Sequence, residues 1–426
     1  YVLGNPPFLG YSNQNPEQKA DILSIYVDEK GKSFKTAGKI DYVAAWYYKA
    51  AQYLQDTNIR AAFVSTNSVT QGEQVAAVWK PLFDLFNIQI DFAHRTFKWE
   101  NEAKGKAAVH CVIVGFSHGW RGERAIYDGD ERIVAGNISP YLIDAPNIFV
   151  ESRRTPLCNI PKMIWGNKPV DGGNLIIEDN EYDDFISREP LSIKYVRRLI
   201  GAEEFIQNKR RYCLWLVGAN PADLRKMPLV IERIEKCRQS RMNSPKAATQ
   251  KLADAPTLFA EIRQPDTEYI VVPEISSERR RYIPIGFVKP DIIASNRLQM
   301  IPCATLYHFG ILTSSTHMAW MRAVCGRMKS DYSYSNTIVY NNFPWPDADE
   351  KQQAQIETLA GAVLEVRAKY PTSSLADLYD PLTMPPDLLR AHQKLDQAVM
   401  KLYGFPRTHT EADIVANLMQ LYQTLV

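Results

Sequence analysis

The residues best suited to chemistry are Asn5-Pro6-Pro7-Phe8, close to the start of the 426-residue chain. The side-chain oxygen of Asn5 and the carbonyl oxygen of Pro6 can both accept hydrogen bonds, and neither competes as a base. Two such acceptors suit an exocyclic amine of a nucleobase, whose lone pair is delocalised into the ring until its N–H bonds are engaged. Phe8 can stack on a base swung out of a duplex. The tetrapeptide therefore predicts a site that activates the amine of a nucleobase.

The element that must position this tetrapeptide is the apolar run Tyr1 to Leu3 before it. It predicts a buried strand ending in a rigid loop, because neither Pro6 nor Pro7 can donate to a sheet and both fix φ. The alternative is a plain strand followed by a proline turn, since turn residues gather at such positions for backbone reasons. We favour the chemical interpretation because more strand-like runs follow at the spacing of an alternating α/β sheet.

The next segments predict the rest of that sheet and its helices. Ile59 to Val69 is a near-continuous apolar run that ends in Ser-Thr-Asn, which predicts a parallel strand buried on both faces. Because ligands in open α/β sheets bind beyond the carboxyl ends of strands, we expect Asn5 and Asn67 to line one crevice. The other predicted elements are a helix at Asp41 to Leu54, a helix at Gly72 to Phe86, and antiparallel strands at Ile88 to Phe97 and Ala107 to Phe116, joined through Lys98 to Lys106.

Four stretches resemble the amino-group DNA methyltransferases, and more narrowly the MmeI-like family of type II restriction-modification enzymes and their adenine-methylating relatives. They are GNPPF at Gly4 to Phe8, STNSV at Ser65 to Val69, the stretch Asp91 to Phe116, and GRMKSDYSYSNTIVYNNFPWP at Gly326 to Pro346. The resemblance covers nearly the whole chain. It implies methylation of adenine N6 with S-adenosyl-L-methionine as donor, within a DNA sequence read by a target-recognition domain.

The same resemblance assigns roles and boundaries. It implies that Asn5 and the Pro6 carbonyl orient the amine, that Pro7 stiffens the loop, and that Phe8 stacks; the step needs no metal. The implied fold is α/β: a partial Rossmann-like methyltransferase sheet, a mixed α/β target-recognition domain, and a small helical C-terminal domain. The expected boundaries are 1–150 for the carboxyl-terminal half of the catalytic domain, 151–346 for target recognition and 347–426 for the helical domain.

The donor site is expected to be largely missing. Enzymes of this class bind the donor through a glycine-rich strand-to-helix turn, and no strand followed by G-x-G occurs in the chain; Gly172-Gly173 stands in a polar loop. The chain also opens with Tyr1 rather than Met, inside an expected central strand. We therefore expect an inactive fragment of a longer enzyme, in which a nuclease domain can be fused upstream.

Composition, with 45% apolar and 23% charged residues, is that of an ordinary soluble globular protein, and a cytoplasmic location is expected. No apolar stretch reaches membrane-spanning length, and the six cysteines show no C-x-x-C spacing, which indicates reduced cytosolic thiols. The formal charge of +2 is uneven, because residues 151–345 carry +7 while 1–150 carry −1 and 346–426 carry −4. The middle segment is the expected partner of double-stranded DNA, although +7 over that length is modest.

Three basic clusters in the middle segment are candidate DNA contacts. Lys209-Arg210-Arg211 and Arg279-Arg280-Arg281 each precede a tyrosine at the expected entrance to a strand, and each is equally well a solvated charged turn. The third is favoured by the resemblance, which assigns phosphate contacts to Arg327, Lys329 and Ser330, with Tyr332, Tyr334 and Asn336 as groove neighbours.

Other expected elements are a basic helix at Pro221 to Arg241 and strands at Glu268 to Val272, Tyr282 to Phe287 and Thr305 to Phe309.

The function favoured is therefore site-specific adenine-N6 methylation of DNA in a restriction-modification system. One alternative is a DNA-binding specificity module with no chemistry of its own. A second is a methyltransferase acting on protein glutamine or RNA, which share the N-P-P-aromatic logic. The long basic region after Val150 argues against the second, because such enzymes need no sequence reader of that size.

Overall fold

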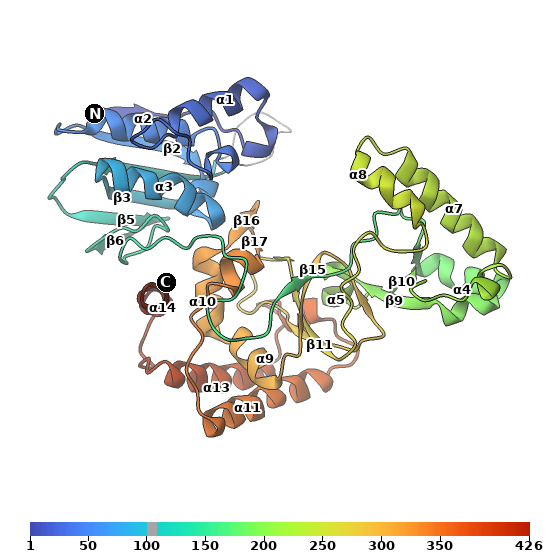
Figure 1. The fold of residues 1–426 in the computed structure, drawn as a ribbon. Helices are drawn as coiled ribbons and strands as arrows, with labels where there is room; N and C mark the ends of the chain where they lie inside the picture. Colours follow the sequence, from blue (N-terminus) through green and yellow to red (C-terminus); the bar gives the residue numbers. More distant parts are fainter. Residues whose placement is uncertain (100–108) are drawn as a thin grey trace. The chain divides into compact units, whose positions relative to one another are not determined.

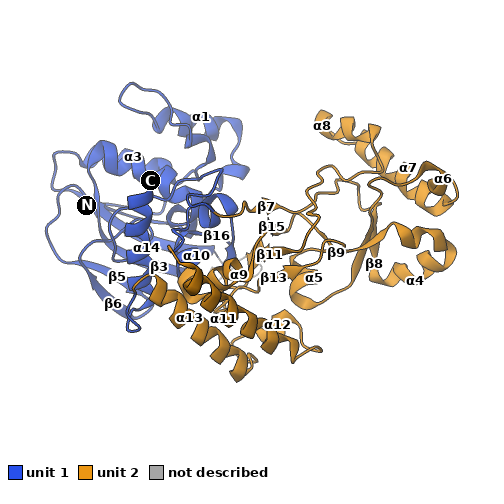
Figure 2. Ribbon diagram, turned by 60° about the horizontal axis from the view of Figure 1, so that its bottom comes forward, with its two compact units in different colours: residues 1–159, 319–346, 405–426 blue, residues 160–318, 347–404 orange. Residues whose placement is uncertain are grey.

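The structure is a computed structural model that describes residues 1–99 and 109–426. The chain forms two compact units (Figure 2). The first unit contains Tyr1–Asn159, Ala319–Pro346 and Phe405–Val426, and the second contains Ile160–Met318 and Asp347–Gly404. Two late segments therefore return to the unit in which the chain begins. Among the described helices, none has the length and apolar character needed to cross a membrane.

The first unit is built on a six-stranded mixed sheet. Its strands, in spatial order, are β1 (Val2–Gly4), β2 (Arg60–Thr66), β4 (Val109–Ser117), β3 (Gln89–Trp99), β5 (Arg124–Asp128) and β6 (Glu131–Ala135). The pairs β1–β2 and β3–β5 are parallel, whereas β2–β4, β3–β4 and β5–β6 are antiparallel. The antiparallel pairing predicted for the two strands β3 and β4 is confirmed. The connection predicted between them lies in residues 100–108, outside the described residues.

The helices of this sheet are α1 (Pro16–Ile25), α2 (Ala44–Leu54) and α3 (Gly72–Phe86), with single turns of 3-10 helix at η1 (Tyr11–Asn13), η2 (Ala37–Lys39) and η3 (Asn67–Thr70). Figure 1 shows α2 and α3 against the sheet. Tyr47 of α2 is buried there, with its ring 5.2 Å from that of Phe63 and its hydroxyl 2.8 Å from Ser65 Oγ. This packing fixes which face of β2 points inward.

The prediction that the strand at β2 is buried on both faces is wrong. Ala61, Phe63 and Ser65 are buried, but the residues between them are only half-buried. The strand is parallel to β1 and antiparallel to β4, so it belongs to a mixed sheet. An apolar run rich in alanine does not distinguish one covered face from two, because alanine is tolerated at half-exposed positions as well as in cores.

The late segments of the first unit are held by side chains of their own. Arg322 donates to both carboxylate oxygens of Glu411 at 2.7 Å, and the rings of Trp320 and Tyr422 lie 5.9 Å apart. These contacts join the segment before the hairpin β16 (Gly326–Met328) and β17 (Asp331–Ser333) to helix α14 (Glu411–Leu425). Phe343 is fully buried, so the end of the late block Gly326 to Pro346 packs into the core of this unit.

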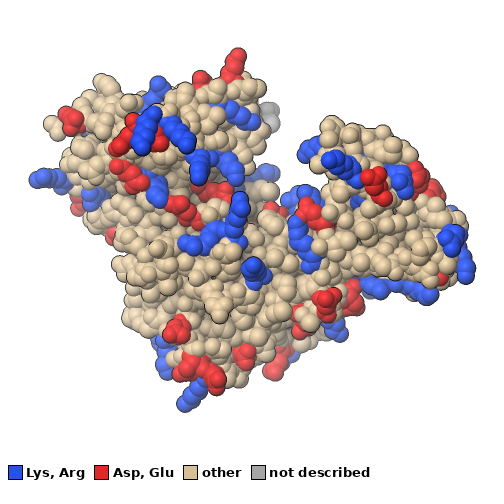
Figure 3. All heavy atoms as spheres, viewed as in Figure 1, with Lys and Arg blue, Asp and Glu red and all other residues tan. Residues whose placement is uncertain are grey.

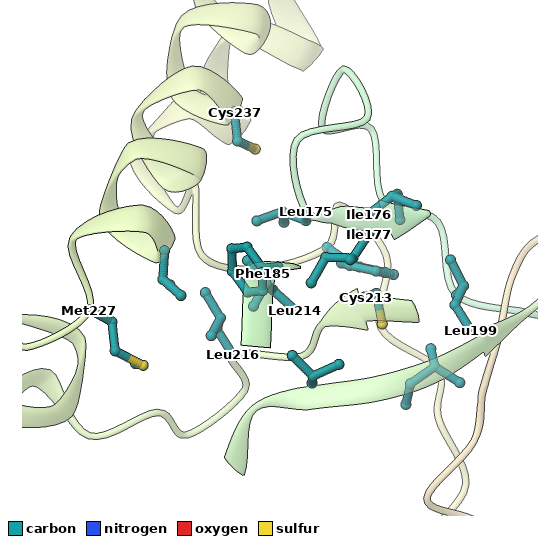
Figure 4. Packing of buried hydrophobic residues seen from close by; sticks show 14 residues of the cluster. Leu175, Ile176, Ile177, Phe185, Leu199, Cys213, Leu214, Leu216, Met227 and Cys237 are labelled. Carbon is teal, nitrogen blue, oxygen red and sulfur yellow. The ribbon is translucent and has the colours of Figure 1, made fainter. Parts of the chain in front are cut away.

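The second unit contains two four-stranded sheets. Their strands are β14 (Ile293–Ala294), β9 (Val196–Ile200), β10 (Arg211–Leu214) and β8 (Ile176–Glu178) in one, and β13 (Gly286–Val288), β11 (Tyr269–Pro273), β15 (Leu298–Pro302) and β7 (Ile164–Trp165) in the other. The core of the first of these sheets is closed by α4 (Asp179–Arg188) and α7 (Pro228–Met242). Figure 4 shows its apolar side chains, with Leu175, Phe185 and Leu214 converging between sheet and helices.

Three element predictions in this unit need correction. The strand expected at Tyr282 to Phe287 is only the short β13 at Gly286–Val288. Thr305 to Phe309 is not a strand but the start of helix α9 (Leu306–Leu312), and the Thr305 side chain caps it by accepting from Tyr307 N at 3.2 Å. The predicted basic helix is interrupted, since α6 (Pro221–Leu224) ends before α7 begins at Pro228. The basic helix fails because Pro228 lacks an N–H and so starts a new helix more readily than it continues one.

Arg241 of α7 is the largest buried charged side chain of the second unit, with only 1% of its surface exposed. Its guanidinium donates to five main-chain carbonyls, those of Val170 (2.8 Å), Pro169 (3.0 Å), Leu252 (2.9 Å), Ala255 (2.9 Å) and Leu258 (2.7 Å). Two separate loops are thereby tied to one helix end. The five N–H donors of an arginine match this set of acceptors, which a lysine could not do.

Helices α11 (Glu350–Ala368) and α13 (Pro386–Leu402) belong to the second unit, whereas α14 belongs to the first. Buried polar side chains attach α13 to the strand-rich part of its unit. Asp396 accepts from Tyr282 Oη and from Ser315 N, both at 2.7 Å. The ring of His392 stacks 4.2 Å from that of Tyr282, and its Nε2 lies 2.8 Å from Tyr379 Oη.

This network makes the second unit sensitive to acid. Burial, reinforced by nearby arginines, holds the pKa of His392 well below its usual value, and burial alone lowers the pKa of His317 to about 3. Both histidines bind a proton in the unfolded chain below about pH 6.5 but not in the folded protein. Folding stability is therefore expected to fall from pH 6.5 to 5.5, by about 1 kcal/mol for each histidine.

Urea unfolding at both pH values measures this loss. The substitution His392→Gln is expected to reduce the slope of the unfolding free energy against pH by the equivalent of about one proton, and the contribution of His317 to that slope should remain. Burial raises the pKa of Asp396, so that carboxyl adds stability below its folded pKa and opposes the trend as the pH falls further. An unchanged slope in His392→Gln would show that the imidazole titrates alike in both states.

Candidate functional site

The Asn5–Phe8 loop begins where β1 ends at Gly4. The prediction that this strand is buried is wrong, because Leu3 is 75% exposed and β1 lies at the edge of the described sheet. Asn5 and Pro7 are exposed, Pro6 is buried and Phe8 is half-buried. Gly4 pairs with Phe63 of β2, and a Cβ at Gly4 would lie 3.2 Å from the Phe63 ring, so the close approach favours glycine. The amide side chain of Asn5 is therefore exposed at the end of the strand, whereas Pro6 is buried in the protein.

The loop forms one side of an open depression of about 600 Å³. The other side comes from α2, and the lining residues that bear on chemistry are Asn5, Pro6, Pro7, Trp46, Lys49 and Tyr53. Tyr53 is 64% exposed, so its ring is available to a ligand. The depression can therefore offer hydrogen-bond acceptors from the loop and aromatic surface from the helix.

Asn67 does not line this depression. It lies in η3 just beyond β2, only 8% exposed, and its carbonyl oxygen accepts from Thr70 Oγ1 at 2.9 Å. The expectation that Asn5 and Asn67 line one crevice is therefore not met by the cavity beside Asn5. Asn67 instead supports the turn that leads from β2 into α3.

The cluster at Lys209 to Arg211 is partly neutralised by carboxylates. Lys209 pairs with Glu203, and Arg211 pairs with Glu178 at 3.1 Å and Glu204 at 3.4 Å. Arg210 is exposed. These are surface pairs of modest strength, so a phosphate could displace them, but the local charge is lower than the sequence suggests.

The cluster at Arg279 to Arg281 spreads over different neighbours. Arg279 lies 3.8 Å from Asp380, and Arg280 donates to Ser276 Oγ at 3.4 Å. The Arg281 guanidinium lies 5.4 Å from the centre of the Tyr282 ring, which is itself buried. The aromatic expected beside this cluster therefore belongs to the core.

The third cluster is the hairpin of β16 and β17. Lys329 is exposed at its turn with φ of +60°, and Arg327 donates to Ser330 O at 3.2 Å while lying 4.1 Å from the Tyr332 ring centre. Tyr332 and Tyr334 are buried, at 6% and 1% exposure, so these two do not fit the role of groove neighbours. They support the hairpin from inside. Asn336 is half-buried in the π-helical turn η6 (Asn336–Tyr340).

The hairpin sits on the turn that starts α3. A Cβ on Gly72, which has φ of +55°, would lie 3.2 Å from the backbone of Gly326. Thr337 Oγ1 also lies 3.5 Å from Glu73 Oε1. The segment that follows β2 and the family-specific late block are thus in direct contact within the first unit, a relation that no sequence pattern indicates.

Charges of both signs are mixed on the surface. Figure 3 shows Lys and Arg interspersed with Asp and Glu over one face, in line with the ion pairs above.

The described residues contain no group of three His, Cys, Asp or Glu side chains placed to hold a metal ion. Gly172-Gly173 is a structural turn, in which Asp171 accepts from Gly173 N at 3.1 Å and Leu175 N at 2.6 Å. These glycines do not fit a donor-binding turn.

Comparison with known proteins gives matches along the whole chain. Residues 1–128 match the model of the MmeI DNA-methyltransferase domain, 144–347 that of the MmeI target recognition domain, and 348–426 that of the MmeI C-terminal domain. DNA methyltransferase A of Bacillus subtilis (strain 168) is 43% identical over 426 residues, which are 100% of this chain and 48% of that protein. The chain spans about half the length of this curated relative.

Among solved structures, the type IIL restriction-modification enzyme MmeI in complex with DNA superposes with a TM-score of 0.93 and 49% identity. The match covers 100% of this chain and 57% of that one. Three consecutive domain models and this structural agreement point to one lineage. The chain belongs to the MmeI-like family of restriction-modification DNA methyltransferases, and it carries that family's methyltransferase, target-recognition and C-terminal domains.

Proposed function

We propose that the protein methylates the N6 amine of adenine at a specific site in double-stranded DNA, with S-adenosyl-L-methionine as donor. The observation that carries this proposal is the exposed Asn5 amide beside the buried Pro6 at the end of β1. The MmeI structure holds DNA, which supports DNA as the partner. In the native enzyme a nuclease can accompany the methyltransferase.

The chain's own residues act on the acceptor. Asn5 Oδ1 and the Pro6 carbonyl accept the two N–H bonds of the amine, which draws the nitrogen toward a pyramidal, nucleophilic geometry. Pro7 limits the motion of the loop, and Phe8 stacks on the flipped base. The donor would supply an electrophilic methyl group, whose bond to the sulfonium sulfur breaks as the amine nitrogen forms the new bond, leaving a neutral thioether. The nitrogen then releases one proton to water. The Gly172-Gly173 turn does not fit the donor, so Asn5 to Phe8 are assigned to the base alone.

The target-recognition role is proposed for residues 151–346. Phosphate contacts fix the register of a protein on a duplex, whereas base edges carry the sequence. We assign phosphate contacts to Arg327, Lys329 and Ser330, and treat Lys209 to Arg211 and Arg279 to Arg281 as further basic contacts. The Lys329 turn is the best supported of these, since Lys329 is exposed at the turn of the β16–β17 hairpin.

The product of the native enzyme tests the proposal directly. Duplex DNA is incubated with the labelled donor and digested to nucleosides, which are separated by mass. N6-methyladenine confined to one sequence context is expected. Methyl groups on cytosine N4, or on protein or RNA alone, would contradict it. Specific DNA binding with no methylated product would favour the specificity module without chemistry.

A calorimetric titration tests the placement of the donor site. This polypeptide is titrated with S-adenosyl-L-methionine, with and without duplex DNA. No heat in either case is expected, because the only paired glycines, Gly172-Gly173, form a structural turn. Saturable binding would place a donor site within these 426 residues and overturn the expectation that this site is largely missing.

Replacing Lys329 with alanine is expected to weaken binding to all DNA sequences about equally. Loss of one phosphate contact removes about one released counterion, so the slope of log K against log salt should fall by about one unit. Fluorescence anisotropy on target and non-target duplexes from 50 to 200 mM salt measures this. Lys351→Ala, at an exposed lysine of α11, is the matched control. A changed target preference would instead assign Lys329 to base reading.

A further inference from the structure

Asp41 joins the segment after the Asn5–Phe8 loop to the segment after β2. Its side chain is only 7% exposed. One carboxylate oxygen, Oδ1, accepts from Tyr11 N at 3.1 Å, and the other, Oδ2, accepts a hydrogen bond from Ser68 Oγ. Ser68 Oγ lies in turn 2.8 Å from Thr66 Oγ1, at the end of β2. One side chain thus links the two strand-end loops.

The backbone around Asp41 makes further connections to the same places. Tyr42 N donates to Leu9 O at 2.9 Å, and Asp41 N donates to Gln74 Oε1 at 3.1 Å. Gln74 belongs to the first turn of α3, which also carries Gly72, the residue in contact with the β16–β17 hairpin. The segment Ile40 to Tyr42 therefore connects the candidate catalytic loop with the element on which the hairpin sits.

The loop depends on these anchors because of its own composition. Pro6 and Pro7 have no N–H, so they cannot fasten the loop by donating. In the described part of the chain, Leu9 and Tyr11 are the first residues after Phe8 that hydrogen-bond to another segment, and both bonds are made with Asp41 or Tyr42. Misplacing a reacting group by about 1 Å can cost about 100-fold in rate.

We propose that Asp41 is a positioning residue for the Asn5–Phe8 loop. It holds Tyr11, and through it the carboxyl side of the loop, at a fixed place relative to Ser68 and the start of α3. The inference rests on the proposed function, because it concerns how the two acceptors are presented to the amine. Asp41 touches neither base nor donor in this role.

The test compares Asp41→Ala with Asp41→Asn in the native enzyme. Alanine removes both acceptors, and kcat is expected to fall about 100-fold with the Kd for target DNA within a few fold of wild type. Asparagine keeps Oδ1 toward Tyr11 N, and its amide can donate to Ser68 Oγ, whose hydrogen is then free for Thr66. We expect Asp41→Asn to stay within about tenfold of wild-type kcat, since only one acceptor changes to a donor.

Two variants keep the test decisive. Ser68→Ala removes one partner of Asp41 without touching the loop, and an intermediate fall in kcat is expected. Asp28→Ala is the matched control, since the Asp28 carboxylate likewise accepts two hydrogen bonds, from Lys30 N and Lys32 N at 2.9 Å, in a loop not tied to the motif. Its kcat should equal that of wild type.

Each outcome decides one question. Loss of kcat in Asp41→Ala with recovery in Asp41→Asn supports the positioning role. Equal losses in both Asp41 variants, or losses of kcat and DNA affinity in parallel, overturn it and make Asp41 a general support of the unit. If Asp41→Ala fails to fold, wild-type kcat in Ser68→Ala overturns it as well. A wild-type enzyme that forms no N6-methyladenine refutes the proposed function before any variant is compared.

Discussion

Replacing Asn5 with alanine in the native enzyme is expected to lower the rate of methylation about 1,000-fold, the upper end of the effect of losing one preorganised polar group. The amide oxygen is one of two acceptors that engage the amine, and the Pro6 carbonyl alone cannot hold both N–H bonds. Asn5 is exposed, so truncating it leaves no cavity and should not destabilise the unit. DNA binding is expected to stay within a few fold of wild type.

Single-turnover methylation with a labelled donor and anisotropy with target DNA separate these two effects. Asn5→Asp keeps an acceptor oxygen and is expected to retain part of the activity. Asn13→Ala, at an exposed asparagine of the next turn, is the matched control and should behave as wild type. A tenfold loss of DNA binding in Asn5→Ala would make Asn5 a structural residue of the loop.

Replacing Arg241 with methionine is expected to lower the free energy of unfolding of the second unit by about 3 to 5 kcal/mol. Methionine roughly fills the space, but it leaves buried carbonyls of two loops without donors. Each of the five bonds comes from a charged donor, and their contributions are not additive because they share one side chain. The cost therefore arises from unsatisfied acceptors and not from lost charge.

Urea unfolding followed by tryptophan fluorescence measures this loss. Arg238→Met provides the control on the same helix, because Arg238 is 41% exposed and donates to a single carbonyl, that of Ala253, at 3.2 Å. Its expected effect is below about 1 kcal/mol. Equal effects of the two substitutions would show that water replaces the Arg241 bonds.

Patterns of local origin were predictable from the sequence. Gly72 to Phe86 is a helix with the predicted bounds, because its apolar periodicity is long and a glycine opens it. Thr305 to Phe309 was mispredicted as a strand because its residues have high strand propensity. The capping interaction of Thr305 with Tyr307 N and His308 outweighs that propensity once the helix packs.

The candidate site was predictable only in part, because some of its contacts join residues that are far apart in the sequence. Asn5 to Phe8 carry their chemistry in adjacent positions, so a short motif is enough to propose them. Asp41 meets Tyr11 and Ser68 across separations of 30 and 27 residues, and no periodicity or spacing indicates such contacts. The burial of Tyr334 was equally hidden, because a tyrosine beside basic residues suits a core and a nucleic-acid surface alike.

The return of residues 319–346 and 405–426 to the first unit affects how the protein is made. A ribosome adds about 5 to 20 residues per second, so the 245 residues of positions 160–404 delay α14 by roughly ten to fifty seconds after the sheet has been synthesised. Until α14 is made, Arg322 cannot form its hydrogen bonds with Glu411, and Trp320 cannot pack against Tyr422. Loss of residues 405–426 would thus harm the unit whose sheet is synthesised before most of the second unit.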